Sequence, residues 1–190
     1  MLKIKATLLF LLVMFSLSIA ATYQIPGDLL REVAKKEKTF NRNPSSHSHR
    51  FELAMSYAYT GQIEKGWETL KKLPENYADT VVSNYAKAIT QEPTEWKHHF
   101  KIAFGYYFKK DRNQAIQSFE QVLKIDPKNV WAMGFISLIK GEQGEVDEAI
   151  RLCKQALAIE PHATAIHFLL GEGYRRKGDY MGFKIGRAHV

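Results

Sequence analysis

The residues that could carry out chemistry are few and poorly arranged for it. His98 and His99 are adjacent, so on a helix their side chains point about 100° apart and do not converge on one metal ion. Glu95 lies one turn before His98 and could share its face, but two ligands do not make a metal site. His47 and His49 flank the start of a predicted helix. The spacing favours surface or packing roles for these histidines and predicts no metal ligand.

A nucleophile with an activating partner is also missing from the sequence. Cys153 is the only cysteine, which rules out a disulfide within the chain. It falls among apolar helical positions with no histidine close by, so we expect a buried and unreactive thiol. The sequence contains no Gly-rich phosphate loop, no HExxH motif and no nucleophile elbow. It therefore predicts no catalytic residue, no cofactor and no enzymatic activity.

The charge balance gives little support for nucleic-acid binding. The net charge is +7, from 27 basic and 20 acidic residues, and it falls to +4 without Lys3, Lys5 and Arg187. The remaining basic residues are interspersed with acidic ones, as on an ordinary solvated surface. A nucleic-acid partner is therefore not expected, and binding by a helical repeat of that kind stays the weakest alternative.

The strongest signal is a fixed interval of 34 residues between like residues. The sets in this register are Pro93, Pro127 and Pro161; Ile89, Leu123 and Leu157; Val81, Ala115 and Ala149; Tyr85, Phe119 and Cys153; and the pair Gly144 and Gly178. A period of this length indicates a solenoid of stacked supersecondary units.

Each period reads as two helices. Over residues 96–109 the apolar residues recur three and four apart, and a second helix is predicted over 113–125. Pro127 then ends the pattern, because proline cannot continue the hydrogen-bond ladder of a helix. Two antiparallel helices and two short turns thus fill one period, with no strand-like alternation.

These residues give the sequence a resemblance to the tetratricopeptide repeat family. The family motif runs from a large, an apolar, a small and an aromatic residue on the first helix to an alanine and an aromatic on the second, and then a proline. That order is followed here by His99, Ile102, Ala103, Tyr106, Ala115, Phe119 and Pro127. Similar units start at Arg50, Met133 and His167. The resemblance implies an all-α, right-handed α-solenoid of antiparallel helix pairs.

The resemblance is good over 96–180, fair over 47–61 and poor between them. Leu73-Pro74 closes one helix early, and 76–91 forms an extra helix that reads either as a degenerate repeat or as an insertion. Asp28 is expected to cap a helix over 29–38 at the start of the solenoid. The predicted segments are a signal peptide (1–20), an N-terminal helix and link (21–45), degenerate tetratricopeptide-like helices (46–93), repeats with the last incomplete (94–183), and a sequencing-adaptor artefact (184–190).

The family resemblance also implies a binding site, because the first helices of such repeats line a concave groove. The residues expected there are Phe51, Met55, Tyr59, Lys97, Phe100, Phe104, Tyr107, Phe108, Trp131, Leu138, Phe168, Glu172, Arg175 and Arg176. This aromatic lining with a basic end suits a peptide or helix of a partner protein. Aromatic residues at this spacing also fit a core between repeats, and both interpretations remain open. Phe100 and Phe104 occupy places where some relatives grip a C-terminal carboxylate with Lys and Asn, which disfavours that binding mode.

The two ends of the sequence carry expectations of their own. Lys3 and Lys5 precede an uncharged stretch over 6–21 that ends in Ser18-Ile19-Ala20, the layout of a signal peptide cut after Ala20. We therefore expect a secreted, periplasmic or envelope protein with no membrane span after cleavage; the alternative is an uncleaved anchor. Residues 185–190 resemble a translated sequencing adaptor, so the natural chain is expected to continue. The leading hypothesis is a protein-binding scaffold, and the alternative is the recruiting arm of a larger enzyme.

Overall fold

The computed structural model describes residues 23–179, 181 and 182, and every regular element in that part is a helix. The predicted signal peptide and the tail at 184–190 lie outside the described residues. Within them, no helix is long and apolar enough to cross a membrane. The helices are α2 (Gly27–Arg42), α3 (His47–Ala58), α4 (Ile63–Leu70), α5 (Tyr77–Gln91), α6 (Trp96–Phe108), α7 (Arg112–Ile125), α8 (Val130–Glu142), α9 (Val146–Ile159) and α10 (Thr164–Lys177).

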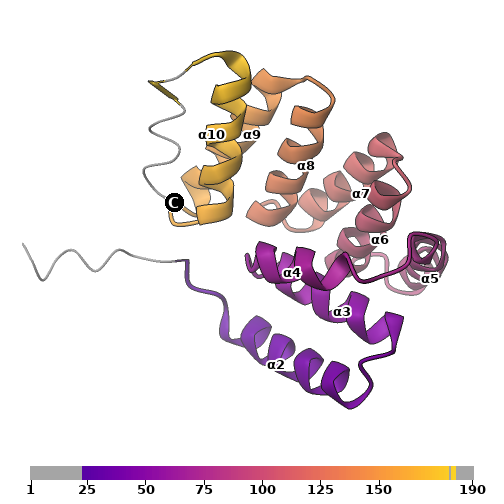
Figure 1. Ribbon diagram of the computed structural model, residues 1–190. Coiled ribbons are helices and arrows are strands. Elements are labelled where there is room, and N and C mark those ends of the chain that lie inside the picture. The colour runs from indigo at the N-terminus through magenta and orange to yellow at the C-terminus, as the bar shows by residue number, and fades with distance from the viewer. Residues whose placement is uncertain (1–22, 180, 183–190) are drawn as a thin grey trace, which may run out of the picture.

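Successive helices form antiparallel hairpins that stack along one direction, with α2 at one end and α10 at the other (Figure 1). Where the two helices of a hairpin cross, small residues let the backbones approach. Ala103 on α6 and Ala115 on α7 are both completely buried. Larger side chains at such a crossing would push the helices apart. The predicted all-α helical repeat fold is confirmed.

Local signals fix where these helices begin. The side chains of Ser46, Asp111 and Asn129 each accept a hydrogen bond from the backbone N–H three residues later, which caps α3, α7 and α8. Between the two helices of a hairpin the chain turns through a left-handed residue. Gly144 holds φ 85° there, and Lys110 holds φ 63° one period earlier without the freedom of a glycine.

An aromatic cluster fills the space between the α6–α7 hairpin and α8. The ring of Phe135 lies 4.7 Å from that of Phe104 and stacks on Phe119 at 5.5 Å. Phe100 meets Phe119 edge-on at 5.3 Å. These offset and edge-on arrangements are the ones that aromatic quadrupoles favour. The aromatic stripe of α6 is therefore, in large part, core.

The first hairpin departs from the regular repeat. Gly66 on α4 lies at the crossing with α3, where an added Cβ would stand 3.2 Å from the carbonyl oxygen of Ala54. Helix α4 ends at Leu70, and α5 then packs against α6, with Val81 and Val82 facing Gly105. The predicted early end of this helix and the extra helix after it are both present.

Helix α2 packs on α3 through a small apolar cluster of Val33, Leu53 and Tyr57, with Phe40 at its edge. It extends further than predicted at both ends. The residue before the helix is Pro26, which forms no side-chain cap, and Asp28 lies inside the first turn. The prediction that Asp28 caps this helix is therefore wrong: the helix begins one residue before Asp28, so its carboxylate lies in the first turn, where it complements the positive end of the helix dipole.

Candidate protein-binding surface

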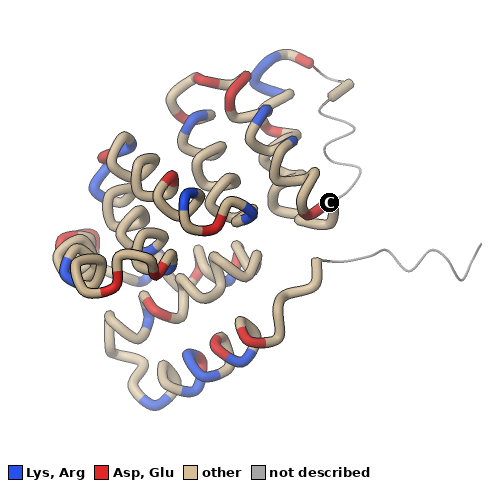
Figure 2. The backbone as a smooth tube through the Cα atoms, turned by 180° about the vertical axis from the view of Figure 1, so that it is seen from behind, with Lys and Arg blue, Asp and Glu red and all other residues tan. Residues whose placement is uncertain are grey.

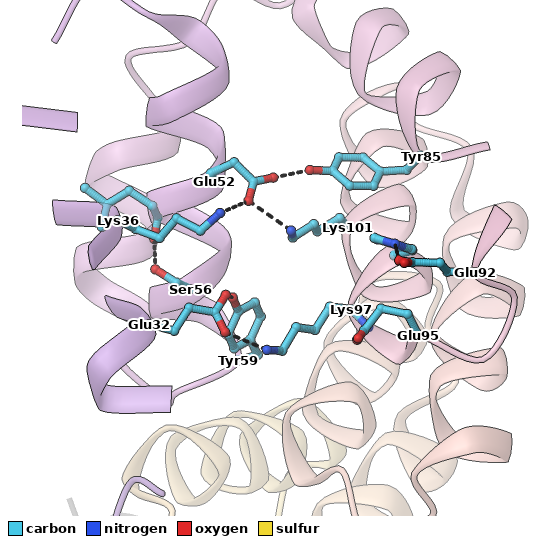
Figure 3. A network of polar contacts seen from close by, with 12 residues as sticks. Glu32, Lys36, Glu52, Ser56, Tyr59, Tyr85, Glu92, Glu95, Lys97 and Lys101 are labelled. Atoms are coloured by element: carbon cyan, nitrogen blue, oxygen red, sulfur yellow. Dashed lines mark hydrogen bonds and ion pairs between the residues drawn. The ribbon is translucent and has the colours of Figure 1, made fainter. Parts of the chain in front are cut away.

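Helix α2 is joined to α3, α5 and α6 by a network of polar side chains whose centre is Glu52 (Figure 3). The Glu52 carboxylate accepts hydrogen bonds from Lys36 of α2, Tyr85 of α5 and Lys101 of α6, the last at 3.0 Å. Burial alone would raise the pKa of Glu52, but the Lys101 charge and the bonds from Lys36 and Tyr85 lower it to about 2. Lys101 is only 7% exposed, and burial lowers its pKa despite the opposing pull of Glu52. Glu52 is thus kept charged in part by Lys101, whose own charged form is disfavoured by burial.

A second carboxylate of α2 reaches the same junction. Glu32 pairs with Lys97 of α6 at 2.5 Å and accepts a hydrogen bond from Tyr59 of α3. Burial would raise the pKa of Glu32, yet its bonds to Lys97 and Tyr59 lower it overall. Burial, and then the neighbouring Glu32, raise the pKa of the Tyr59 phenol. Lys97, predicted to face a partner, is therefore paired within the chain.

Six of the residues predicted to line the groove are buried in the core, each at most 5% exposed. They are Phe51, Met55, Tyr59, Phe100, Phe104 and Trp131. The prediction that these side chains present an accessible lining is wrong for the described structure. They form the packing between units instead, which was the other interpretation of their helical spacing.

The reason lies in where the first hairpin packs. The turn between α3 and α4 reaches the start of α8, and an added Cβ on Gly61 would stand 2.3 Å from the Trp131 ring. Tyr23, which precedes α2, packs edge-on against the same ring at 5.1 Å, and the Trp131 indole N–H donates to its hydroxyl at 3.3 Å. Segments about 70 and 108 residues away in sequence thus cover Trp131, and no 34-residue register could have predicted them.

The accessible part of the predicted lining lies on α6, α8 and α10, and α4 adds to it. Tyr107, Phe108 and Leu138 are half-buried, whereas Phe168 is 56% exposed. Trp67 of α4 is 44% exposed, and its ring lies 6.3 Å from Tyr107 and 6.0 Å from Phe108. Trp67, Tyr107 and Leu138 border a small apolar hollow. Trp67 was not predicted, because it belongs to the short helix where the repeat register fails.

Polar contacts connect this hollow to α10 across the C-terminal ends of the helices. The Tyr107 hydroxyl donates to Glu142 at 2.7 Å, and Arg176 donates to the carbonyl of Gly141 at 2.7 Å and to Glu172 at 2.8 Å. Phe168 precedes Glu172 by one helical turn and shares its face. We call the whole set, Trp67, Tyr107, Leu138, Glu142, Phe168, Glu172, Arg175 and Arg176, the α4–α10 surface. Bonds from Arg175 and then Arg176 lower the pKa of Glu172 to about 2.

The histidines and the cysteine have structural neighbours. His98 pairs with Glu92 at 2.9 Å, and the ring of His99 contacts the carbonyl of Pro93 at 2.9 Å. Glu95 caps α6 by accepting from a backbone N–H rather than facing His98. Cys153 is buried 3.0 Å from the Ser137 hydroxyl, and burial raises the pKa of its thiol to about 11. Among the described residues no three potential metal ligands come together.

Sequence comparison finds the same repeat. The family model described as the tetratricopeptide repeat matches residues 99–129. A TPR repeat-containing protein, MJ1428 of Methanocaldococcus jannaschii, is 29% identical over 84 residues. That alignment covers 44% of this chain but only 15% of the relative, so the chain spans a small part of that protein.

Solved structures agree in fold. TTC0263, a thermophilic TPR protein of Thermus thermophilus, superposes with a TM-score of 0.55 at 18% identity, covering 82% of this chain and 78% of that one. MamA superposes with a TM-score of 0.52 at 16% identity, covering 86% of each chain. At these identities the likeness concerns the fold alone.

Proposed function

Because this chain is a tetratricopeptide repeat protein, and such repeats mediate protein–protein interaction, we propose that its α4–α10 surface binds an apolar peptide segment of a partner protein. The observation that carries this proposal is the exposure of two aromatic side chains, Trp67 of α4 and Phe168 of α10, at the two ends of the polar contacts that run from Tyr107 to Glu172. Large exposed aromatics on a monomer favour an interaction site, and such residues often supply most of the binding energy.

The surroundings of these two residues support the same ligand chemistry. The hollow beside Trp67 is lined almost entirely by apolar side chains, but it has room for only about one water molecule. An apolar anchor of the partner would therefore pack over the hollow, against the exposed face of Trp67, rather than enter it. Arg175 and Arg176 stand at the other end and already hold one carboxylate, that of Glu172. A peptide with an apolar anchor followed by an acidic residue would match both ends of the surface.

The test uses selection from a random dodecapeptide display library, followed by titration of a selected peptide. We expect enriched peptides to share an apolar anchor, and we expect Trp67→Ala and Phe168→Ala each to weaken binding about tenfold. Phe104→Ala is not a suitable probe, because Phe104 lies in the core and its loss would destabilise the fold.

Matched controls come from the second helices of the repeats. Ile125 of α7 and Ile159 of α9 are also exposed large apolar residues, but they lie at the ends of helices away from the α4–α10 surface. Ile125→Ala and Ile159→Ala should leave the affinity unchanged. Failure to enrich any peptide, or equal losses for all four variants, would overturn the proposal.

The scaffold is further proposed to act outside the cytoplasm, in the periplasm or cell envelope. This rests on the sequence of residues 1–20 alone, with its basic start, its uncharged stretch and its small residues before Ala21. N-terminal sequencing of the protein recovered from fractionated cells should give Ala21 as the first residue of an exported form. Recovery of intact Met1 from the soluble cytoplasmic fraction would contradict export.

A further inference from the structure

The charges of α2 are sorted between its two sides. Charged positions follow one another closely along this helix (Figure 2). Two of its three acids contact the protein: Glu32 pairs with Lys97, and Glu37 accepts from the Tyr57 hydroxyl at 2.6 Å, whereas Asp28 is exposed. Its basic residues, apart from Lys36, are exposed. The pairing of Glu32 and Glu37 within the protein therefore leaves a solvent side that is mainly basic, with Asp28 as its one acid.

Four of these basic residues form a stripe: Arg31, Lys35, Lys38 and Arg42. They recur four, three and four residues apart, which on a helix of about 100° per residue keeps all four within an arc of about 60°. The buried side of α2, at Val33 and Phe40, lies about 180° away from the middle of this arc. We call these four residues the basic stripe; its middle points away from the rest of the protein, while Lys35 at one edge borders a hollow that Glu32 and Glu52 also line.

The basic stripe is unpaired in a protein whose other lysines and arginines are often paired. Of the ion pairs among the described residues, none involves Arg31, Lys35, Lys38 or Arg42. Asp28, in the first turn, is the one acid of α2 near the border of the arc. Four adjacent unpaired cations repel one another, so their placement on one side has a cost that an anionic surface would remove.

We propose that the basic stripe of α2 binds the anionic headgroups of a lipid bilayer. The sequence around the helix favours lipid over other polyanions. Helix α2 begins at Gly27, six residues after the uncharged apolar stretch that ends at Ala21. If that stretch is kept as an anchor, it holds α2 beside the membrane surface; if it is cut during export, α2 becomes the first helix of the released chain. Leu30, 48% exposed on the flank of the helix, is positioned to enter the headgroup region.

The binding test uses the processed chain that starts at Ala21, because residues 23–182 contain all the described packing of α2. Cosedimentation is measured with vesicles of phosphatidylcholine containing phosphatidylglycerol, and with vesicles of phosphatidylcholine alone. Each cation near an anionic surface strengthens association about fivefold, so changing Arg31, Lys35, Lys38 and Arg42 together to Gln should weaken binding by two orders of magnitude or more. The binding of the unchanged chain should also fall steeply with added salt.

The matched control removes the same net charge elsewhere. Lys72, Lys87, Lys124 and Lys128 are all exposed and form no ion pair among the described residues. Changing all four to Gln should weaken vesicle binding by less than tenfold. Equal losses for the two fourfold variants would show that only the net charge matters and would overturn the proposal. So would binding to neutral vesicles as tight as to anionic ones, or binding to DNA or an acidic protein without binding to vesicles. Peptide binding at the α4–α10 surface is a separate measurement and should be unaffected in both variants.

Discussion

The polar junction of α2, α3, α5 and α6 makes a strong prediction about Glu52. Changing Glu52 to Gln removes the partner of Lys101, which is only 7% exposed, and leaves that ammonium buried without a countercharge. The pKa of Glu52 lies near 2 instead of 4.5, a difference worth about 3 kcal/mol of folding stability at neutral pH. Removal of one partner of a buried pair costs about the same amount in other proteins. We therefore expect a loss of about 3 kcal/mol in the free energy of unfolding.

The direction in which this stabilisation changes with pH follows from the lowered pKa of Glu52. A carboxyl group whose pKa is lower in the folded state stabilises the protein fully at pH values above its pKa in the unfolded state. This contribution is lost as the pH falls through the pKa of the group in the folded state. The difference between the unchanged protein and Glu52→Gln should therefore shrink from about 3 kcal/mol near pH 6 to about half of that at pH 3. The lowered pKa of Lys101 opposes this gain, so about 3 kcal/mol is an upper estimate for the pair.

Urea unfolding followed by circular dichroism measures these differences from the midpoint at constant slope. The control is Glu172→Gln: the pKa of Glu172 is also near 2, but its arginine partners are solvent-exposed, so the expected loss is about 0.5 kcal/mol. A second change, Lys101→Met, should recover at least half of the loss caused by Glu52→Gln, because it removes the unpaired buried charge. Equal losses for Glu52→Gln and Glu172→Gln, or no recovery in the double variant, would refute the role of burial.

Three further predictions concern single sites. Gly61→Ala should lower the free energy of unfolding by about 3 kcal/mol, because the added Cβ would meet the Trp131 ring. Gly144 also has a left-handed φ but has open space around it, so Gly144→Ala should cost only about 1 kcal/mol. Urea unfolding of the two variants compares these losses. Lys110→Gly should raise the melting temperature by a few degrees in calorimetry, because Lys110 is exposed and holds a left-handed φ of 63° that glycine adopts more easily. An unchanged or lower melting temperature would show that this backbone conformation is not strained. Cys153 should react with a thiol reagent only after unfolding at pH 8, and rapid labelling of the native protein would contradict its burial and raised pKa.

Much of the fold could be predicted because the repeat is a local code. Each helix from α6 to α10 is specified by apolar residues three and four apart and by a closing signal such as Pro127. The small residues at helix crossings, such as Ala103 and Ala115, follow from the same register. The start of α2 could not be predicted as well, because Asp28 is equally suited to capping a helix and to the first turn within one.

The binding surface was less predictable, because the register gives the direction of a side chain but not what stands in front of it. Phe100 and Phe104 do point where the register places them, into a space that Tyr59 and Phe135 then fill. Trp131 is covered by Gly61 and Tyr23 through contacts that no periodicity encodes.

The irregular first hairpin thus determines which part of the molecule is free to bind. In a uniform solenoid every first helix would contribute to one continuous groove. Here α3 contributes its large apolar residues to the core, and α2 pairs with Lys97, so the first helices of the N-terminal half are occupied from within. What remains accessible is the exposed aromatic of α4 together with α6, α8 and α10. The two proposed contacts therefore lie on different parts of the molecule, a partner peptide on the α4–α10 surface and a lipid headgroup region on the outer side of α2. A protein with this arrangement could bind both at the same time.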